Sequence, residues 1–180
     1  MRTDKAALHV GEETYAQRAV RTLSAGLRPV MVVTNDSAPF EGLSVTCVAD
    51  HPERRDPMGA ILTGWERLQA AEVFVAAVDM PGLDAAVIGR LMRVASEHPE
   101  DAIVAPSGIR GYEPLHALYR ASAIPVMRRR HAEGMRSLQG LMEDLPVRCV
   151  PRDALAAGPW AFRSVNTPED LASWEKSGGA

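Results

Sequence analysis

Cysteine and net charge are both scarce in this sequence, and each shortage excludes a class of protein. Cys47 and Cys149 are the only two cysteines in 180 residues and lack C-x-x-C spacing, so the sequence indicates neither a disulfide framework nor a zinc site. A formal net charge of -3 provides no basic surface for nucleic acid or for an anionic membrane. We therefore expect a protein of the reducing cytoplasm that binds neither nucleic acid nor membranes.

Long apolar runs are absent as well. No stretch approaches the roughly 20 apolar residues that span a bilayer, and the N-terminus has no apolar segment of the signal-peptide type. The five histidines form no H-x-H or H-x-x-x-H pair, which argues against a transition-metal site. The composition, 46% hydrophobic and 24% charged, is that of an ordinary folded protein, so residues 1–180 are expected to form a single domain.

Short apolar runs alternate along the chain with segments of helical periodicity. Strands that alternate with helices predict an open, mainly parallel α/β sheet with a ligand crevice at the carboxyl ends of its strands. The predicted strands lie at 30–33, 44–48, 73–78, 103–105, 115–119 and 147–150, and the predicted helices at 15–25, 58–71, 83–98, 123–132, 137–145 and from 168 onward.

The most informative run is Val73 to Val78, which ends at Asp79 and Pro81. Its apolar, partly β-branched composition predicts a strand buried on both faces, as in parallel sheets. Pro81 stops the strand because it has no N–H to donate, and helical spacing resumes from Leu83. Asp79 therefore lies on a strand-to-helix loop, where α/β proteins place catalytic residues. The alternative is that Asp79 only caps the following helix.

Polar residues follow three successive predicted strands: Asn35, Asp50 and Asp79. If these strand ends share one crevice, the amide and the carboxylates can form hydrogen bonds with the base or the sugar of a nucleotide. One of the acids can also bind a hard cation. The sequence thus predicts a nucleotide site. The alternative for Asn35 and Asp50 is an ordinary turn, which their side-chain hydrogen bonding favours.

Eight short motifs occur in this order along the chain: Asp4-Lys5-Ala6, Thr34-Asn35, Ala49-Asp50, Asp56-Pro57-Met58-Gly59-Ala60-Ile61, Val78-Asp79-Met80-Pro81, Glu113-Pro114-Leu115-His116-Ala117-Leu118-Tyr119, Arg136-Ser137-Leu138 and Val165-Asn166-Thr167-Pro168-Glu169-Asp170-Leu171. In this order they resemble the motifs of the molybdenum cofactor guanylyltransferases, the MobA family of NTP transferases. The resemblance implies a three-layer Rossmann-like nucleotidyltransferase fold of the α/β class with a mainly parallel, mixed sheet. It also implies a nucleotide-binding half at residues 1–100 and a pterin-binding half at residues 101–180.

The reaction that the resemblance implies is the transfer of GMP from GTP to molybdopterin, or Mo-molybdopterin, which forms molybdopterin guanine dinucleotide and releases pyrophosphate. In that family the lysine of the Asp-Lys motif contacts the nucleotide phosphates, a role that falls on Lys5. The Asn and Asp at the two earlier strand ends bind the guanine nucleotide, which falls on Asn35 and Asp50. The Asp before the proline binds Mg2+, which falls on Asp79. Lys5 and Asp79 are thus the expected catalytic residues, and Mg2+ often takes one or two carboxylates plus substrate phosphates.

The second substrate is expected to contact the C-terminal half. Asn166 keeps one amide of the family's N-x-N motif before the last helix, and it is expected to bind the pterin together with Arg110. Besides GTP and molybdopterin, the resemblance implies transient contact with molybdenum-cofactor enzymes or their chaperones. The arginine run 128–130 is interpreted as a solvated helix face, with an anion site for the pterin phosphate as the alternative.

The sequence departs from the family pattern at its start. Members carry a first strand and a signature of the form L-A-G-G-x-S-x-R-M-G-x-D-K before the lysine, and Met1 falls on the internal methionine of that signature, so the resemblance implies a truncated signature. Removal of this central strand would leave two neighbouring strands with unpaired ladder groups in a buried place, so we expect poor stability, or a rearranged or substituted pairing. Asp56 replaces a glycine and is expected to repel phosphate. Two alternatives follow: a non-catalytic homologue, and a transferase that uses CTP or another nucleotide.

Overall fold

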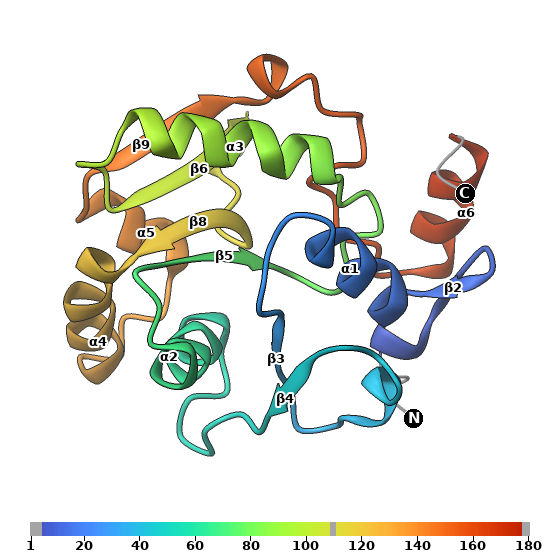
Figure 1. Ribbon diagram of the computed structural model, residues 1–180, viewed down its shortest axis with the longest axis horizontal. Coiled ribbons are helices and arrows are strands. Elements are labelled where there is room, and N and C mark those ends of the chain that lie inside the picture. Colours follow the sequence, from blue (N-terminus) through green and yellow to red (C-terminus); the bar gives the residue numbers. More distant parts are fainter. Residues whose placement is uncertain (1–4, 109–110, 178–180) are drawn as a thin grey trace.

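The computed structural model describes residues 5–108 and 111–177, and it confirms the α/β class with helices on both faces of a mixed sheet (Figure 1). The strands are β1 (His9–Val10), β2 (Glu13–Thr14), β3 (Met31–Val33), β4 (Thr46–Val48), β5 (Glu72–Ala76), β6 (Ile103–Gly108), β7 (Gly111–Tyr112), β8 (His116–Arg120) and β9 (Val147–Pro151). The helices are α1 (Tyr15–Ser24), α2 (Pro57–Leu68), α3 (Ala85–Glu97), α4 (Ile124–Ala132), α5 (Leu138–Glu143) and α6 (Pro168–Lys176), with short 3-10 helices η1 (Lys5–Ala7), η2 (Ala38–Phe40), η3 (Ala121–Ala123) and η4 (Arg152–Leu155).

The larger sheet has five strands in the order β5-β8-β6-β7, and β9 also pairs with β6. Strand β8 is antiparallel to both β5 and β6, and β9 is parallel to β6. Strands β5, β6 and β9 therefore run in the same direction, and their carboxyl ends meet at one edge of the sheet. That edge is where an α/β sheet places its ligands.

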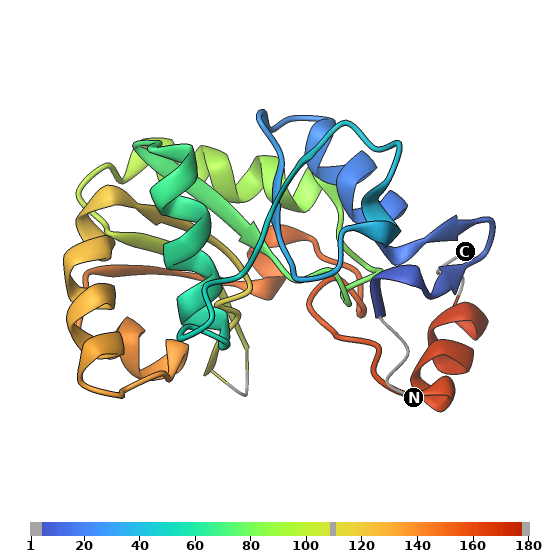
Figure 2. The ribbon, with the colours of Figure 1, turned by 90° about the horizontal axis from the view of Figure 1, so that it is seen from below.

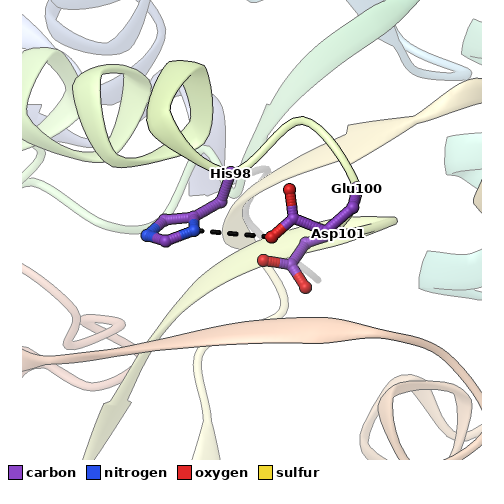
Figure 3. A group of neighbouring side chains, drawn as sticks. All are labelled: His98, Glu100 and Asp101. Atoms are coloured by element: carbon purple, nitrogen blue, oxygen red, sulfur yellow. Dashed lines mark ion pairs between the residues drawn. The ribbon is translucent and has the colours of Figure 1, made fainter.

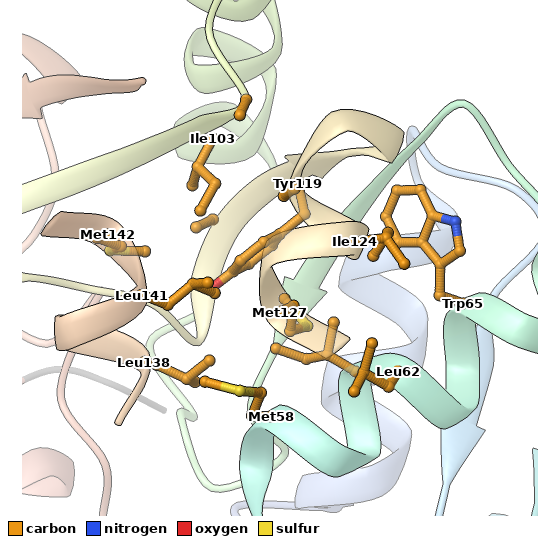
Figure 4. Packing of buried hydrophobic residues seen from close by; sticks show 14 of the residues in the cluster. Met58, Leu62, Trp65, Ile103, Tyr119, Ile124, Met127, Leu138, Leu141 and Met142 are labelled. Carbon is orange, nitrogen blue, oxygen red and sulfur yellow. The ribbon is translucent and has the colours of Figure 1, made fainter. Parts of the chain in front are cut away.

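Alternate residues of the central strands pack against opposite helical layers, as the period of two in a strand requires. Ile103 and Tyr119 face α2, α4 and α5, where they join the cluster that contains Leu62, Met127 and Leu141 (Figure 4). Val104 and Leu118 face the other way, toward α3 and the segment that contains Phe162. All four of these strand residues are fully buried, so β6 and β8 are the centre of the core.

Strands β3 and β4 form a separate parallel pair rather than joining the larger sheet. Both views place this pair beside β5 (Figures 1 and 2). Among the residues that the structure describes, no strand pairs with the second edge of β3 or of β5. The expected rearranged or substituted pairing is therefore not found at these two edges within residues 5–108 and 111–177. The prediction that the run Val73 to Val78 is buried on both faces was wrong, because without a neighbour on that side its residues are only half-buried.

Side-chain caps set the start of each described α-helix except α4. Thr167 caps α6 through the Asp170 N–H at 3.1 Å, as predicted, and Asp170 accepts a hydrogen bond from the Thr167 N–H in return. Thr14 and Gln17 form the same reciprocal box at the start of α1. Within the described part of the chain, none of the helices has both the length and the apolar character needed to cross a bilayer.

Candidate active site

Asp79 lies in the turn that follows β5, at the edge where β5, β6 and β9 end. Its side chain is 18% exposed, and one carboxylate oxygen accepts a hydrogen bond from the Lys5 ammonium at 2.8 Å. The helix after it is capped by Asp84, which accepts hydrogen bonds from the N–H groups of Ala86 and Val87. The interpretation of Asp79 as a mere helix cap was therefore wrong.

Lys5 also donates a hydrogen bond to the side-chain oxygen of Asn166, a residue 161 positions away in sequence. Two backbone contacts fix Asn166 at this place. The N–H of Val165 donates to the carbonyl of Asp79 at 2.9 Å, and the N–H of Asn166 donates to the Asp170 carboxylate at 3.0 Å. The structure thus brings together three of the residues that were predicted for the site: Lys5, Asp79 and Asn166.

Packing between the two ends of the described chain explains this convergence. The β1–β2 hairpin, which leads into α1, lies beside α6 in both views (Figures 1 and 2). Val10, Tyr15, Val165 and Trp174 form one buried cluster between these segments. Burial of large apolar side chains here, worth about 2 kcal/mol each, holds η1 and the segment before α6 on either side of Asp79.

The donor set at this cluster fits a hard divalent cation. A carboxylate oxygen of Asp79 and the amide oxygen of Asn166 both contact one ammonium group, and oxygen is the ligand type that Mg2+ takes. The Lys5 side chain is 45% exposed, so its ion pair with Asp79 contributes no more than about 1 kcal/mol. Lys5 can therefore exchange Asp79 for a phosphate at little cost.

Asn35 and Asp50 meet in a second group, at the carboxyl ends of β3 and β4. The N–H of Asp50 donates to the side-chain oxygen of Asn35 at 3.2 Å. One carboxylate oxygen of Asp50 is buried and has no hydrogen-bond partner among the described residues. Asp50 lines an open pocket of about 410 Å3 together with His51, Thr63 and Arg67. A buried acceptor without a donor is costly, so this carboxylate is suited to a ligand that brings a donor.

Asp56 was expected to repel phosphate, and its surroundings weaken that expectation. One oxygen caps α2 through the Gly59 N–H at 3.0 Å, and the other contacts Arg136 at 2.5 Å and His131 at 3.0 Å. Burial alone raises the pKa of Asp56, but the hydrogen bonds from Gly59, Arg136 and His131 outweigh it and hold the pKa below its usual value. The carboxylate is thus ionised and already balanced by a cation.

Arg152 is a functional candidate that the sequence reasoning missed. It directly follows β9 at the same edge of the sheet, donates a hydrogen bond to Glu113 and stacks its guanidinium over Phe162 at 5.1 Å. The sequence did contain a pattern that could have indicated Arg152, because it is a polar residue just after a strand, as Asp79 is. Arg110, which was predicted to bind the pterin, lies outside the described residues.

His116 was also missed as a special position. It lies between the rings of Phe74 and Phe162, edge to face with each, and neither ring nitrogen has a hydrogen-bond partner among the residues described. Burial lowers the pKa of His116 to about 4, although the charge of Asp84 acts in the opposite direction. The side chain is therefore neutral near pH 7 and packs as an aromatic ring between the two phenylalanines.

Another group of metal-ligand type, His98, Glu100 and Asp101, lies between the end of α3 and the start of β6, away from the strand carboxyl ends (Figure 3). Its charges have protein partners. Asp101 accepts a hydrogen bond from Arg148 at 2.8 Å, and the His98 ring lies 3.5 Å from the Glu100 carboxylate. We assign this cluster to stability rather than to chemistry.

Comparison with known proteins finds a matching family domain and several similar proteins. The MobA-like NTP transferase domain matches residues 1–154. A probable molybdenum cofactor guanylyltransferase from Opitutus terrae is 33% identical, over 94% of this chain and 86% of its own. A protein of the same description from Chloroflexus aggregans is 32% identical, over 94% of this chain and 84% of its own.

Solved structures agree on the fold. Molybdopterin-guanine dinucleotide biosynthesis protein A from Archaeoglobus fulgidus superposes with a TM-score of 0.78 at 21% identity, covering 98% of this chain and 91% of its own. The 2-C-methyl-D-erythritol 4-phosphate cytidylyltransferase from Thermus thermophilus reaches a TM-score of 0.75 at 15% identity, covering 98% of this chain and 94% of its own. The architecture is therefore that of nucleotidyltransferases.

Proposed function

The chain belongs to the MobA-like NTP transferase family, and on that premise we propose that it transfers GMP from GTP to molybdopterin. The products are molybdopterin guanine dinucleotide and pyrophosphate. The single observation that carries this proposal is the meeting of Lys5, Asp79 and Asn166 at the carboxyl edge of the sheet. Membership of this family makes the protein an enzyme of the nucleotidyltransferase class.

In the proposed reaction the terminal phosphate oxygen of molybdopterin attacks the α-phosphorus of GTP. A new phosphorus–oxygen bond forms as the bond to the β-phosphate oxygen breaks, and pyrophosphate leaves with the electron pair. Lys5 places an ammonium beside the phosphates, where it offsets the negative charge that grows on the leaving group. No protein nucleophile is needed, because catalysis of this kind rests on positioning and electrostatics.

Asp79 and Asn166 are the residues proposed to hold Mg2+. When bound, the cation supplies charge neutralisation at the phosphates. The chain's own contribution is to keep the two oxygens in place, which the backbone contact between Val165 and Asp79 and the cap of α6 both support.

Asn35 and Asp50 are proposed to bind the base or the sugar, as part of a nucleotide-binding half that comprises residues 1–100. The buried, unpartnered carboxylate oxygen of Asp50 suits an amino donor such as that of guanine. Cytosine also offers an amino group, so CTP is the second candidate donor. A competition series with GTP, CTP, ATP and UTP decides between them, and GTP is expected to compete best.

Residues 101–180 are proposed to bind the pterin. Asn166 and Arg110 are the residues assigned to it, and Arg152 adds a cation at the same edge of the sheet. The product is proposed to pass, in the cytoplasm, to molybdenum-cofactor enzymes or to their chaperones through transient contact.

The direct test is pyrophosphate release from GTP and molybdopterin with Mg2+, with the Asp79→Asn variant measured beside the parent chain. Loss of an electrostatic group at the reacting centre is expected to lower turnover by about a hundredfold or more. Asp84→Asn is the matched control, because asparagine caps a helix as well as aspartate does, and its turnover should stay within about twofold.

Two results contradict the proposal. Equal turnover in the Asp79→Asn variant removes Asp79 from the mechanism. Absence of pyrophosphate release by the parent chain with any of the four nucleotides favours the alternative of a non-catalytic homologue.

A further inference from the structure

Arg18, near the start of α1, contacts two other segments of the chain. Its Nε donates a hydrogen bond to the carbonyl of Pro81 at 2.7 Å. Its guanidinium also stacks over the ring of Trp174 on α6, 5.1 Å from the ring centre. Arg18 is half-buried and Trp174 is fully buried. One side chain of α1 therefore links the turn after β5 to α6.

The turn that accepts this hydrogen bond comes directly after Asp79. The N–H of Leu83 donates to the carbonyl of Met80 at 3.1 Å, which closes a four-residue turn with Pro81 as its second residue. Pro81 is itself buried, so its carbonyl is held on the inside of the fold. The bond from Arg18 to this carbonyl therefore limits how far the chain can move at Asp79.

The two oxygen donors of the proposed cation site come from different segments. Asp79 belongs to the loop after β5, and Asn166 lies just before α6. One backbone bond joins these segments at the site, from the N–H of Val165 to the carbonyl of Asp79 at 2.9 Å. Two oxygens can ligate one cation only while their separation is held, and residues outside the ligand set commonly provide that hold.

Arg18 joins the same two segments a second time. Its hydrogen bond fixes the turn after β5, and its stacking contact fixes α6 through Trp174, which shares a buried cluster with Val165. A planar guanidinium suits both contacts, because it donates hydrogen bonds at its edge and stacks with its face. A lysine at this position would offer a donor but no planar face.

We propose that Arg18 is a positioning residue for the proposed cation site. Its guanidinium holds the turn after β5 against α6, and this keeps the oxygens of Asp79 and Asn166 together. The described hydrogen bond of Arg18 goes to Pro81, so its effect on the cation is exerted through the backbone. The inference rests on the proposed function, because that reaction gives the two oxygens their cation.

Site-resolved hydrogen exchange of the full chain tests this role without any substrate. Arg18→Met keeps an apolar stem over Trp174 but removes the donor to Pro81. Exchange at the Val165 amide should accelerate by about tenfold or more, because local opening then breaks its bond to Asp79, while the amides of β6 keep the parent rates. Arg18→Lys retains a donor and the charge and should show a smaller acceleration.

The kinetics of pyrophosphate release give a second readout, taken well below the thermal midpoint of each variant and normalised to the folded fraction. In Arg18→Met the turnover should fall by about tenfold, and the Mg2+ concentration for half-maximal rate should rise by about tenfold. The KM for GTP should change by less than about threefold, because the base is proposed to be held at Asn35 and Asp50. A purely structural role would lower the folded fraction and leave these normalised values unchanged.

Arg21→Met is the matched control. Arg21 lies on the same helix, its side chain is 61% exposed, and it pairs with Glu13 at 2.7 Å. The variant therefore removes the same kind of guanidinium from α1 without touching the turn after β5. Turnover, Mg2+ dependence and exchange at Val165 should all stay within about twofold of the parent chain.

Three results would overturn the inference. They are unchanged exchange at Val165 in Arg18→Met, an equal acceleration in Arg21→Met, and parent-like turnover and Mg2+ dependence of Arg18→Met when the parent chain is active. A parent chain that releases no pyrophosphate contradicts the proposed function instead, and the exchange at Val165 then decides by itself whether Arg18 positions the two segments. If Arg18→Met does not fold, Arg18→Lys takes its place, and unchanged exchange at Val165 in that variant is equally decisive against the inference.

Discussion

The five-stranded sheet and the β3–β4 pair are built from similar apolar sequences, yet only the central strands of the first have fully buried side chains. Val104 and Leu118 in the larger sheet are 0% exposed, whereas Val32 in β3 is only half-buried. The difference follows from the neighbours. Strands β6 and β8 have partners on both edges and helices on both faces, whereas β3 has one strand partner among the described residues. Strand burial is therefore decided by neighbours and not by composition alone.

The proposed site draws on both regions. Lys5, Asp79 and Asn166 gather beside the well-packed sheet, and Asn35 and Asp50 follow the strands of the loosely packed pair. One half of the proposed site thus lies beside the buried core, and the other half is attached to the less buried β3–β4 pair.

Core substitutions should separate the two regions most clearly. Leu118→Ala should lower the free energy of unfolding by about 4 kcal/mol, because it opens a cavity among fully buried side chains. Val32→Ala should cost about 1 kcal/mol, because the site is half-buried and can relax. Urea denaturation of both variants measures the difference, and equal losses would show that the two regions are packed alike.

The second largest effect is a pH dependence of the free energy of unfolding, which arises from His116 in the larger sheet. The pKa of His116 is lowered to about 4 in the folded chain and is about 6.5 when unfolded, so the unfolded state binds the proton first as the pH falls. Stability is therefore fully present above pH 6.5 and declines by about 3 kcal/mol toward pH 4.

His116→Leu should remove most of this decline in denaturation curves recorded across that pH range. His9→Leu, at an exposed position in β1, should keep it. A decline that persists unchanged in the His116→Leu variant would assign the acid sensitivity to another group.

Helix caps should act alike in both regions, because a cap depends on local geometry and not on burial of the sheet. Thr14→Ala at α1 and Thr167→Ala at α6 each remove a capping hydroxyl and should each cost about 1 kcal/mol in urea denaturation. The matching Ser variants should retain most of the stability. A loss at Thr14 several times larger than that at Thr167 would mean that α1 stabilises the β3–β4 pair cooperatively.

Stability should change least at Lys5. Lys5→Gln should alter the free energy of unfolding by less than about 1 kcal/mol, because the Lys5 side chain in the ion pair with Asp79 is 45% exposed and solvent screens the pair. Pyrophosphate release should nevertheless fall strongly, because the ammonium is lost from the phosphates. A large loss of stability would mean that Lys5 is a structural link between the chain ends.

The sequence predicted most elements because their signals are local. The apolar runs and caps located β5, α3 and α6 to within a few residues, and Asn35, Asp50 and Asp79 do follow the strands that were expected before them. The contact between Lys5 and Asn166 was not predicted, because no local pattern joins residues 161 positions apart; the family resemblance had only named both residues for the site.

The missed features depend on tertiary neighbours. Burial of the run Val73 to Val78 was overestimated, because periodicity cannot show whether a strand has a partner on each edge. His116 looked like one of five isolated histidines, and only the two phenylalanine rings around it make it distinctive. Arg152 was missed because its strand was expected to end one residue earlier, at Val150.

Hydrogen exchange with and without GTP and Mg2+ tests most directly whether one nucleotide contacts both the five-stranded sheet and the β3–β4 pair. We predict slower exchange in the segments that contain Asn35 and Asp50 and, in the same experiment, around Asp79 and Asn166. Protection confined to one of the two groups, or absent from both at saturating GTP, would contradict joint binding.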